Sequence, residues 1–260
     1  MTSRIFFIIS VCFVVGLSNS AFIDEIYKCS ISDNDCQKKL FHESLNKISK
    51  TGIPELNIPP IDPIHLQDVT VTVLNLVNLT LVDGVVKGAK DCVFTKYSID
   101  IEKGKGHNIL VCDVVIKGHY RLRAASPLIE SVLGGSEING EGKGRVKLDK
   151  LQLEFIFPVN VVRKDDGEIY ISCDYEHVDQ RLDVLGGATF AAEKIYLGKQ
   201  DVSELVMKYL NDNWKFVIKS FGQVFVEKAS EFYNSFSSNF FDSVPAKNYI
   251  IEDLAPYLKD

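Results

Sequence analysis

Apolar and polar residues alternate along much of the first two thirds of the chain. From Val69 to Leu81 the odd-numbered positions are apolar, with Asn75 as the exception. The same period of two returns in later runs, at residues 93–101, 110–122, 151–159 and 169–175. A period of two places one face of a strand on a core and the other in water, which is typical of antiparallel sheets. We therefore predict strands from residue 64 to about residue 197.

Two segments have the longer period of an α-helix. Residues 33–49 are predicted to form an amphipathic helix that either Asp33 or Asn34 caps. Residues 201–241 are predicted to form one very long helix, because they contain no proline and a single interior glycine, Gly222. The apolar stripe of this helix drifts around its axis, which suits a partner that curves around the helix.

Together these elements predict an α+β protein with one continuous domain over residues 21–260. A long antiparallel sheet with one dry face must curl around something apolar, and the C-terminal helix is the available partner. No linker, shift in composition or internal repeat divides the chain. The predicted fold is a long C-terminal helix wrapped by a strongly curved antiparallel β-sheet, with an elongated hydrophobic tunnel between them.

Residues 1–20 have the pattern of a signal peptide. A short basic segment ending at Arg4 precedes the apolar run Ile5–Leu17. Ser18 and Ser20 place small residues at −3 and −1, so we predict cleavage after Ser20. The apolar run is too short to span a bilayer comfortably, and no later segment is long and apolar enough. The sequence therefore predicts a secreted protein in an extracellular fluid.

The charge of the chain argues against polyanionic partners. The sequence has 29 Lys and Arg against 35 Asp and Glu, a net charge of −6. An acidic protein gains nothing from electrostatic attraction to nucleic acid or to anionic lipid. The alternation also suggests no Lys/Arg cluster on one predicted face. We expect no nucleic-acid partner and no stable membrane insertion.

No motif points to catalysis or to a metal. The Gly134-Gly135-Ser136 turn lacks the second glycine of a nucleophile elbow. The glycines at 140, 142 and 144 lead into a strand, whereas phosphate-binding glycines precede a helix. The five histidines are scattered, and there is no CxxC or HxxxH spacing. We expect no enzyme activity, no cofactor and no metal site.

The most specific pattern lies in residues 29–66. Cys29 and Cys36 enclose six residues, a polar helix follows, and the prolines of Gly52–Ile64 hold the next segment extended. This order resembles the start of the takeout and haemolymph juvenile hormone binding protein family of insect secreted proteins. Further similar segments are residues 148–155, 210–215 and 240–245. The resemblance covers the chain from Ile26 to about Leu254.

The resemblance implies a fold and a function. The family has a long helix inside a curved sheet, and it carries small hydrophobic molecules. It implies a ligand such as juvenile hormone, another terpenoid, a quinone or a fatty acid, carried in haemolymph or another extracellular fluid. Local spacing and the resemblance together predict a Cys29–Cys36 disulfide. Many members have a cysteine near Leu151 that this chain lacks, so Cys92, Cys112 and Cys173 stay unassigned, and at least one of them is free or pairs with another chain.

A slot between helix and sheet would be lined by the helix stripe and by inward strand positions. The candidates are Tyr97, Tyr120, Tyr175, Leu210, Trp214, Phe221, Phe225 and Phe232. A tyrosine hydroxyl in a dry slot can bond an ester, epoxide or carbonyl oxygen of a ligand. Two alternatives stay open, because aromatics on a buried stripe mostly pack the core and core tyrosines often bond a backbone carbonyl.

A second function class is also open. The alternative is a secreted protein-interaction module, with a receptor or lipoprotein as partner and a slot that is merely structural. We expect a monomer in either case. The sequon Asn78-Leu79-Thr80 is a glycosylation candidate, because the alternation places Asn78 on the solvent face with Thr70 and Thr72. An unused sequon is the alternative there.

Overall fold

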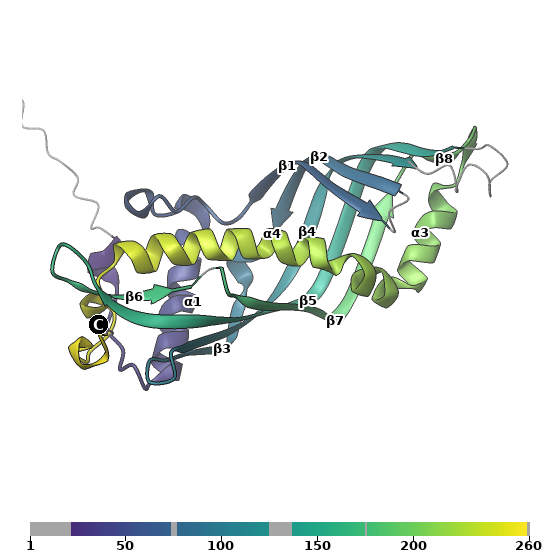
Figure 1. The fold of residues 1–260 in the computed structure, drawn as a ribbon. Helices are drawn as coiled ribbons and strands as arrows, with labels where there is room; N and C mark the ends of the chain where they lie inside the picture. Colours follow the sequence, from purple (N-terminus) through teal and green to yellow (C-terminus); the bar gives the residue numbers. More distant parts are fainter. Residues whose placement is uncertain (1–21, 74–76, 125–136, 175, 259–260) are drawn as a thin grey trace, which may run out of the picture.

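The computed structural model describes residues 22–73, 77–124, 137–174 and 176–258. The predicted signal peptide, residues 1–20, lies outside the described residues. The structure is an elongated α+β protein in which an antiparallel sheet curves around a long C-terminal helix (Figure 1). This is the fold that the alternation and the long apolar helix predict.

Within the described residues the sheet has nine strands. The strands are β1 Ile64–Val73, β2 Val77–Lys87, β3 Val93–Asp100, β4 Lys105–Ala124, β5 Ile138–Arg163, β6 Ile169–Cys173, β7 Asp179–Ala192, β8 Ile195–Leu197 and β9 Gln200–Asp201. The two longest, β4 and β5, pair with each other along most of their length. Both strands are long enough to pair with several neighbours along their length. β4 also pairs with β2 and β3, and β5 also pairs with β6, β7 and β8.

The run that alternates from Val69 to Leu81 is a hairpin and not one strand. β1 ends at Val73 and β2 begins at Val77. The register pairs Val69 with Leu81 and Val71 with Leu79, so odd positions meet odd positions across the hairpin. The apolar positions of β1 and β2 therefore share one face, which explains why the alternation conceals the break between the strands.

The first helix follows its sequence signals. Helix α1 spans Asn34–Thr51, and the Asp33 carboxylate accepts a hydrogen bond from the Cys36 N–H at 2.9 Å. Gly52 ends the helix with a positive φ of 66°, a backbone conformation that glycine adopts at little cost. Short 3-10 helices complete the described helical segments: η1 Phe22–Glu25, η2 Pro54–Leu56, η3 Ala89–Asp91, η4 Ala246–Asn248 and η5 Ala255–Tyr257.

The prediction of one unbroken C-terminal helix is wrong at a single residue. The structure has α3 over Ser203–Asp212 and α4 over Trp214–Ser243, set at an angle to each other at Asn213 (Figure 1). The Asn213 side chain donates to the carbonyl oxygen of Tyr209 at 2.8 Å, which competes with continued helix there. Asn211 bonds both the N–H and the C=O of Phe190, and this contact holds α3 against β7.

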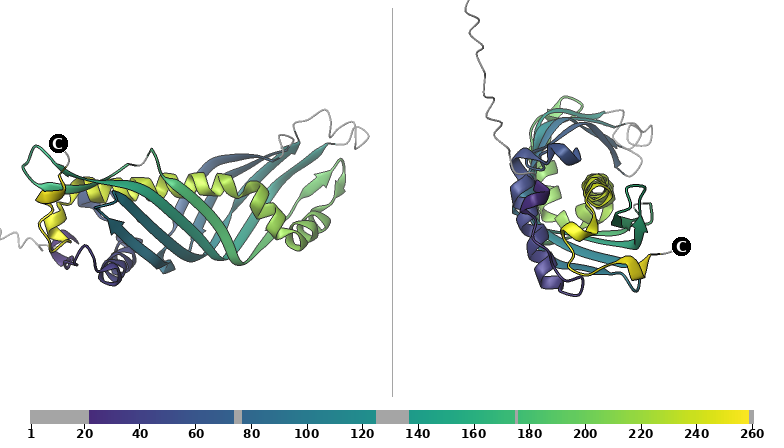
Figure 2. Two further views of the ribbon diagram at one scale, coloured as in Figure 1. Left: turned by 60° about the horizontal axis from the view of Figure 1, so that its bottom comes forward. Right: turned by 90° about the vertical axis from the view of Figure 1, so that its left-hand side faces the viewer.

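Helix α4 lies within the curve of the sheet, as the end-on view shows (Figure 2). The packing is asymmetric along its length. At one end Phe240 and Phe241 are buried against Phe41 of α1 and against Tyr249. At the other end α3 has no buried residue. The molecule is therefore closed by a dense aromatic core at the α1 end and is more loosely packed at the α3 end.

The structure contains the predicted Cys29–Cys36 disulfide and a second one between Cys92 and Cys112. The Cys29 N–H donates to the Tyr249 carbonyl and the Cys29 carbonyl accepts from the Ile251 N–H, which places the first disulfide beside the C-terminal segment. The second disulfide joins the residue before β3 to β4. Cys173 is a buried thiol on β6.

Candidate ligand-binding groove

A groove of about 970 Å³ runs between β7 and the first turns of α4. Within the described residues β7 pairs with β5 alone, so its other edge is left to face the helix. The lining residues are Gln180 to Gly186 of β7 and Trp214, Lys215, Ile218, Lys219 and Gly222 of α4. The groove exists because a strand at the edge of an open sheet meets a helix that it does not fully cover.

The floor of the groove is apolar. Leu182 and Val184 are two residues apart on β7, so both point to the inner face of the sheet. Trp214 and Ile218 are four residues apart on α4 and therefore share one face of the helix. A Cβ built on Gly222 would lie 3.6 Å from Leu182 Cδ2, which is ordinary contact. The glycine thus leaves room for about one methyl group beside the floor.

The rim of the groove is charged and mostly cationic. Arg181, Lys215 and Lys219 are exposed around it, together with Asp183. The Lys215 ammonium lies 5.6 Å from the centre of the Trp214 ring. An apolar floor with a few polar groups at its edge is the usual design of a small-molecule site. This groove suits an apolar molecule that has a polar or acidic end.

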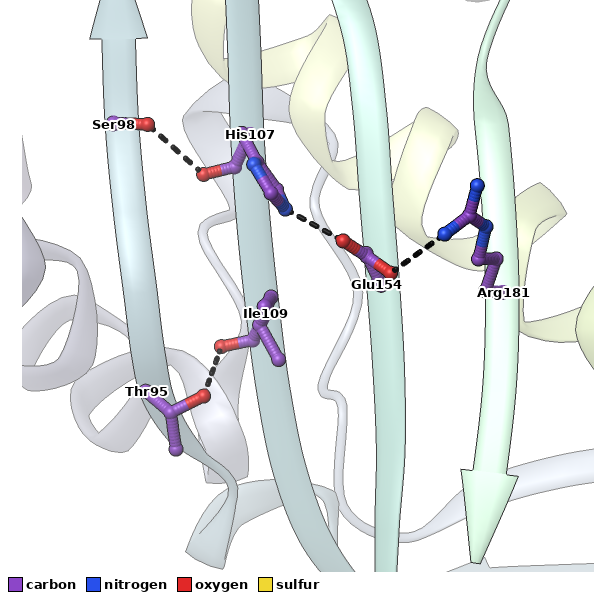
Figure 3. A network of polar contacts seen from close by, with 6 residues as sticks. All are labelled: Thr95, Ser98, His107, Ile109, Glu154 and Arg181. Carbon is purple, nitrogen blue, oxygen red and sulfur yellow. Dashed lines mark hydrogen bonds and ion pairs between the residues drawn. The ribbon is translucent and has the colours of Figure 1, made fainter.

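A polar network on the outer face of the sheet holds one rim residue (Figure 3). The Arg181 guanidinium lies 3.9 Å from Glu154, and Glu154 contacts the His107 ring at 2.7 Å. The three residues come from β7, β5 and β4, which are neighbours in the sheet. Ser98 of β3 donates to the His107 carbonyl and extends the network. Arg181 in this way connects the rim of the groove to the polar network on the sheet.

A second feature is a buried polar cluster between β4 and α4. Asn108 is 2% exposed, and its amide donates to the Tyr233 hydroxyl at 2.5 Å. The Tyr233 ring stacks on Phe155 with centroids 4.0 Å apart. Burial raises the pKa of Tyr233, which keeps its hydroxyl neutral. Among the described residues no hydrogen-bond partner is present for Asn108 Oδ1, so this oxygen can accept a hydrogen bond from a further polar group.

Sequence reasoning missed this cluster, although a signal was present. Asn108 occupies an inward position of the alternation that continues with Leu110 and Cys112. A polar residue on a dry face needs a partner, and here the partner is Tyr233, which is 125 positions away in the sequence.

The predicted lining residues are distributed over several places. Trp214 lines the groove. Leu210 is half-buried on α3 and lies outside the groove. Tyr97 stacks on Phe41 of α1, with ring centroids 4.4 Å apart, at the opposite end of the molecule. Tyr120 donates its hydroxyl to the Glu193 carbonyl at 2.7 Å, which is the core alternative left open by the sequence.

Several predictions fall outside the described residues. They are Tyr175, the side chains of Phe221, Phe225 and Phe232, and the Gly134-Gly135-Ser136 turn. An enclosed tunnel along the middle of α4 therefore stays a prediction. Asn78 is half-buried, and its side chain accepts a hydrogen bond from Thr72 at 2.9 Å, on the face predicted for it.

Two further observations concern membranes and metals. None of the helices in the described ranges is both long and apolar enough to cross a bilayer. In the same ranges no three His, Cys, Asp or Glu side chains gather closely enough to hold a metal ion.

The fold and the groove define the general class of the protein. A curved antiparallel sheet around one long helix, with a groove between them that has an apolar floor, is an arrangement for binding hydrophobic ligands. The model of the family described as haemolymph juvenile hormone binding protein (JHBP) matches residues 7–251. The chain therefore belongs to this family.

A solved structure shares the fold. The crystal structure of Takeout 1 from Epiphyas postvittana superposes with a TM-score of 0.75 at 22% identity, covering 86% of this chain and 99% of that chain. A lipopolysaccharide binding protein gives a TM-score of 0.41 at 8% identity over 81% of this chain and 38% of that one, which is too low to support an argument. No curated protein matches the sequence.

Proposed function

We propose that this protein is a secreted carrier that binds a small hydrophobic ligand between α4 and the curved sheet. The observation that carries this proposal is the groove of about 970 Å³, with its apolar floor and cationic rim. Membership of the JHBP family supports hydrophobic-ligand binding in general. Binding, and not catalysis, is the activity that we propose.

The chemistry of the groove narrows the class of ligand. Removing about 200 Å² of apolar ligand surface from water contributes roughly 5 kcal/mol, which suits a chain or ring system of moderate size. Arg181, Lys215 and Lys219 at the rim favour an acceptor oxygen or a carboxylate at one end of that ligand. Juvenile hormone, another terpenoid, a quinone or a fatty acid each combine an apolar body with an acceptor oxygen. Among them, the carboxylate of a fatty acid would interact most strongly with the cationic rim.

The proposal includes an extracellular location. The Cys29–Cys36 and Cys92–Cys112 disulfides fit an oxidising export route. We further propose that residues 1–20 are removed as a signal peptide, and that residues 21–260 act as a single-domain monomer.

Trp214 offers a direct test, because it is the single tryptophan of the chain and lines the groove. The purified secreted protein is titrated with oleate and, separately, with a neutral terpenoid ester. A ligand in the groove is expected to shift or quench the Trp214 emission in a saturable way at micromolar concentration. If neither probe binds, the carrier proposal fails and the protein-interaction module becomes the better interpretation.

A charge variant tests the role of the rim. Lys219→Glu is expected to weaken oleate binding several-fold, by an amount that falls at high salt, and to leave the neutral ester nearly unaffected. Lys28→Glu is the matched control, since Lys28 is also exposed but precedes Cys29, outside the groove. Equal effects of the two variants on oleate would show that the rim does not contact the carboxylate.

A further inference from the structure

The structure gathers basic side chains on the outer face of the sheet, which corrects the sequence-based expectation that no such cluster exists. The residues are Lys87 of β2, Lys117, Arg121 and Arg123 of β4, and Lys143, Arg145 and Lys147 of β5. The register pairs Lys117 with Arg145 and His119 with Lys143, so odd positions of β4 and β5 share one face. We call these residues the basic face. Sequence reasoning missed the basic face because its residues come from different strands. They become neighbours only when β4 and β5 pair in this register.

Few of these charges are neutralised within the protein. Arg121 pairs with Glu141 at 3.2 Å and Lys147 with Asp149 at 2.7 Å. The remaining cations of the basic face, Lys87, Lys117, Arg123, Lys143 and Arg145, form no ion pair within the described part of the chain.

Lys117 and Arg145 also stand directly opposite each other on neighbouring strands. Like charges in that position destabilise a sheet. In a chain with a net charge of −6, a concentration of unneutralised cations points to an anionic partner.

The basic face contains a hollow of about 960 Å³. Its charged lining comprises Lys87, Lys117, Lys143 and Arg145, the histidines His65 and His119, and the acids Asp83 and Glu193. The four cations outnumber the two acids, and the His119 ring contacts the Asp83 carboxylate at 2.9 Å. Gly84, Gly118 and Gly144 are paired across three strands and contribute backbone to the lining of the hollow, although their Cα–H groups point to the inner face of the sheet.

We propose that the basic face docks an acidic segment of a partner protein in an extended conformation. Lys143 and Arg145, which form no ion pair within the described residues, stand two residues apart on β5, a spacing of about 6.6 Å. An extended peptide has the same period, so Asp or Glu at alternate positions would each meet one cation. The hollow of about 960 Å³ can hold a peptide strand, whereas a flat lipid surface would only bridge it.

The test uses the full secreted protein and a fluorescent 12-residue probe with Glu and Ser in alternation. At low ionic strength we expect saturable binding that weakens as salt is added. A peptide of the same composition with all Glu in one block should bind less tightly, because its charges do not match the spacing of β5. The double variant Lys143→Glu/Arg145→Glu is expected to lower affinity for the alternating probe by about tenfold or more.

Lys90→Glu/Lys96→Glu is the matched control, since it changes the net charge equally at exposed positions outside the basic face. This control should lose less than about threefold in affinity. Equal losses in both double variants, or equal binding of both peptides, would overturn the proposal. Tighter binding of heparin or of phosphatidylserine vesicles than of the alternating peptide would overturn it in favour of a polysaccharide or a lipid surface. Both double variants, if folded, should bind oleate with the wild-type affinity in the Trp214 emission assay. This readout separates a failure of the carrier function from a failure of peptide docking.

Discussion

At the scale of single residues, the buried Tyr120 and the partly buried Tyr233 show how polar groups in this interior are satisfied. The Tyr120 hydroxyl donates to the backbone carbonyl of Glu193. The Tyr233 hydroxyl accepts a hydrogen bond from the Asn108 amide between sheet and helix. Both hydroxyls are therefore part of the packing. Their removal should be seen first in stability and not in ligand affinity.

Tyr120 should make stability depend on alkaline pH. Burial raises its pKa to about 12 in the folded protein, against an ordinary value near 10. The folded state thus holds the proton more tightly, so this contribution is complete below about pH 10 and is lost as the pH rises towards 12. We expect Tyr120→Phe to make the loss of stability between pH 10 and 12 shallower, as measured by urea unfolding.

Tyr170 provides the comparison, because its hydrogen bond to Asp166 raises its pKa to about 12 as well. Tyr170→Phe should also make the loss of stability between pH 10 and 12 shallower. The effects of the two substitutions on the free energy of unfolding should add in the double variant. An unchanged pH profile in Tyr120→Phe would contradict the assignment.

The Asn108–Tyr233 hydrogen bond should behave as a coupled pair. Tyr233→Phe leaves the buried Asn108 amide without this partner and should cost about 1–3 kcal/mol of unfolding free energy. Asn108→Leu removes the polar group itself. The double variant is expected to be less destabilised than the sum of the single variants, in a double-mutant cycle by chemical denaturation. Strict additivity would show that the two groups do not interact.

At the scale of elements, the contact between α4 and β7 decides the size of the groove. Gly222 sits on α4 where the helix passes Leu182, and a Cβ there meets only ordinary contacts. The glycine is therefore not required by steric crowding. It weakens the helix and leaves space at the floor of the groove.

Two substitutions at Gly222 separate these effects. Gly222→Ala should stabilise the protein by about 0.5–1 kcal/mol through helix propensity and leave oleate affinity nearly unchanged. Gly222→Leu should fill the floor and weaken oleate binding by about tenfold or more. Thermal unfolding and Trp214 emission report the two quantities. If Gly222→Leu binds oleate like the wild type, the ligand does not occupy this part of the groove.

At the scale of the whole molecule, the two ends differ in how firmly they are packed. The α1 end is closed by Phe41, Phe240, Phe241 and Tyr249, whereas α3 has no buried residue. Regions with few buried contacts open at lower free energy than a packed core. The α3 end is therefore the expected route by which a ligand reaches the groove.

Hydrogen exchange measures this asymmetry. We expect amides of α3 to exchange faster than amides near Phe240, and oleate to slow exchange most in β7 and in the first two turns of α4. The control is the same experiment on Gly222→Leu, in which oleate should give little protection. Uniform protection along the chain would argue against a ligand held at the α3 end.

The sequence by itself determined the elements that depend on local geometry. The alternation from Val69 onwards requires a sheet with one dry face, and Asp33 with Gly52 sets the limits of α1, because periodicity and capping act within a few residues. The Cys29–Cys36 pair is equally local. The family resemblance rested on the same short segments and their order along the chain.

Only the tertiary structure decided the features that join distant segments. The hairpin before Val77 keeps the alternation intact, so pattern alone could not show it. The break at Asn213 accompanies the bonds between Asn211 and Phe190, and the Cys92–Cys112 pair needs β3 beside β4. The groove arises where the edge strand β7 meets α4. The basic face arises from the register between β4 and β5. Those contacts are set by packing over the whole molecule, which no local window of sequence contains.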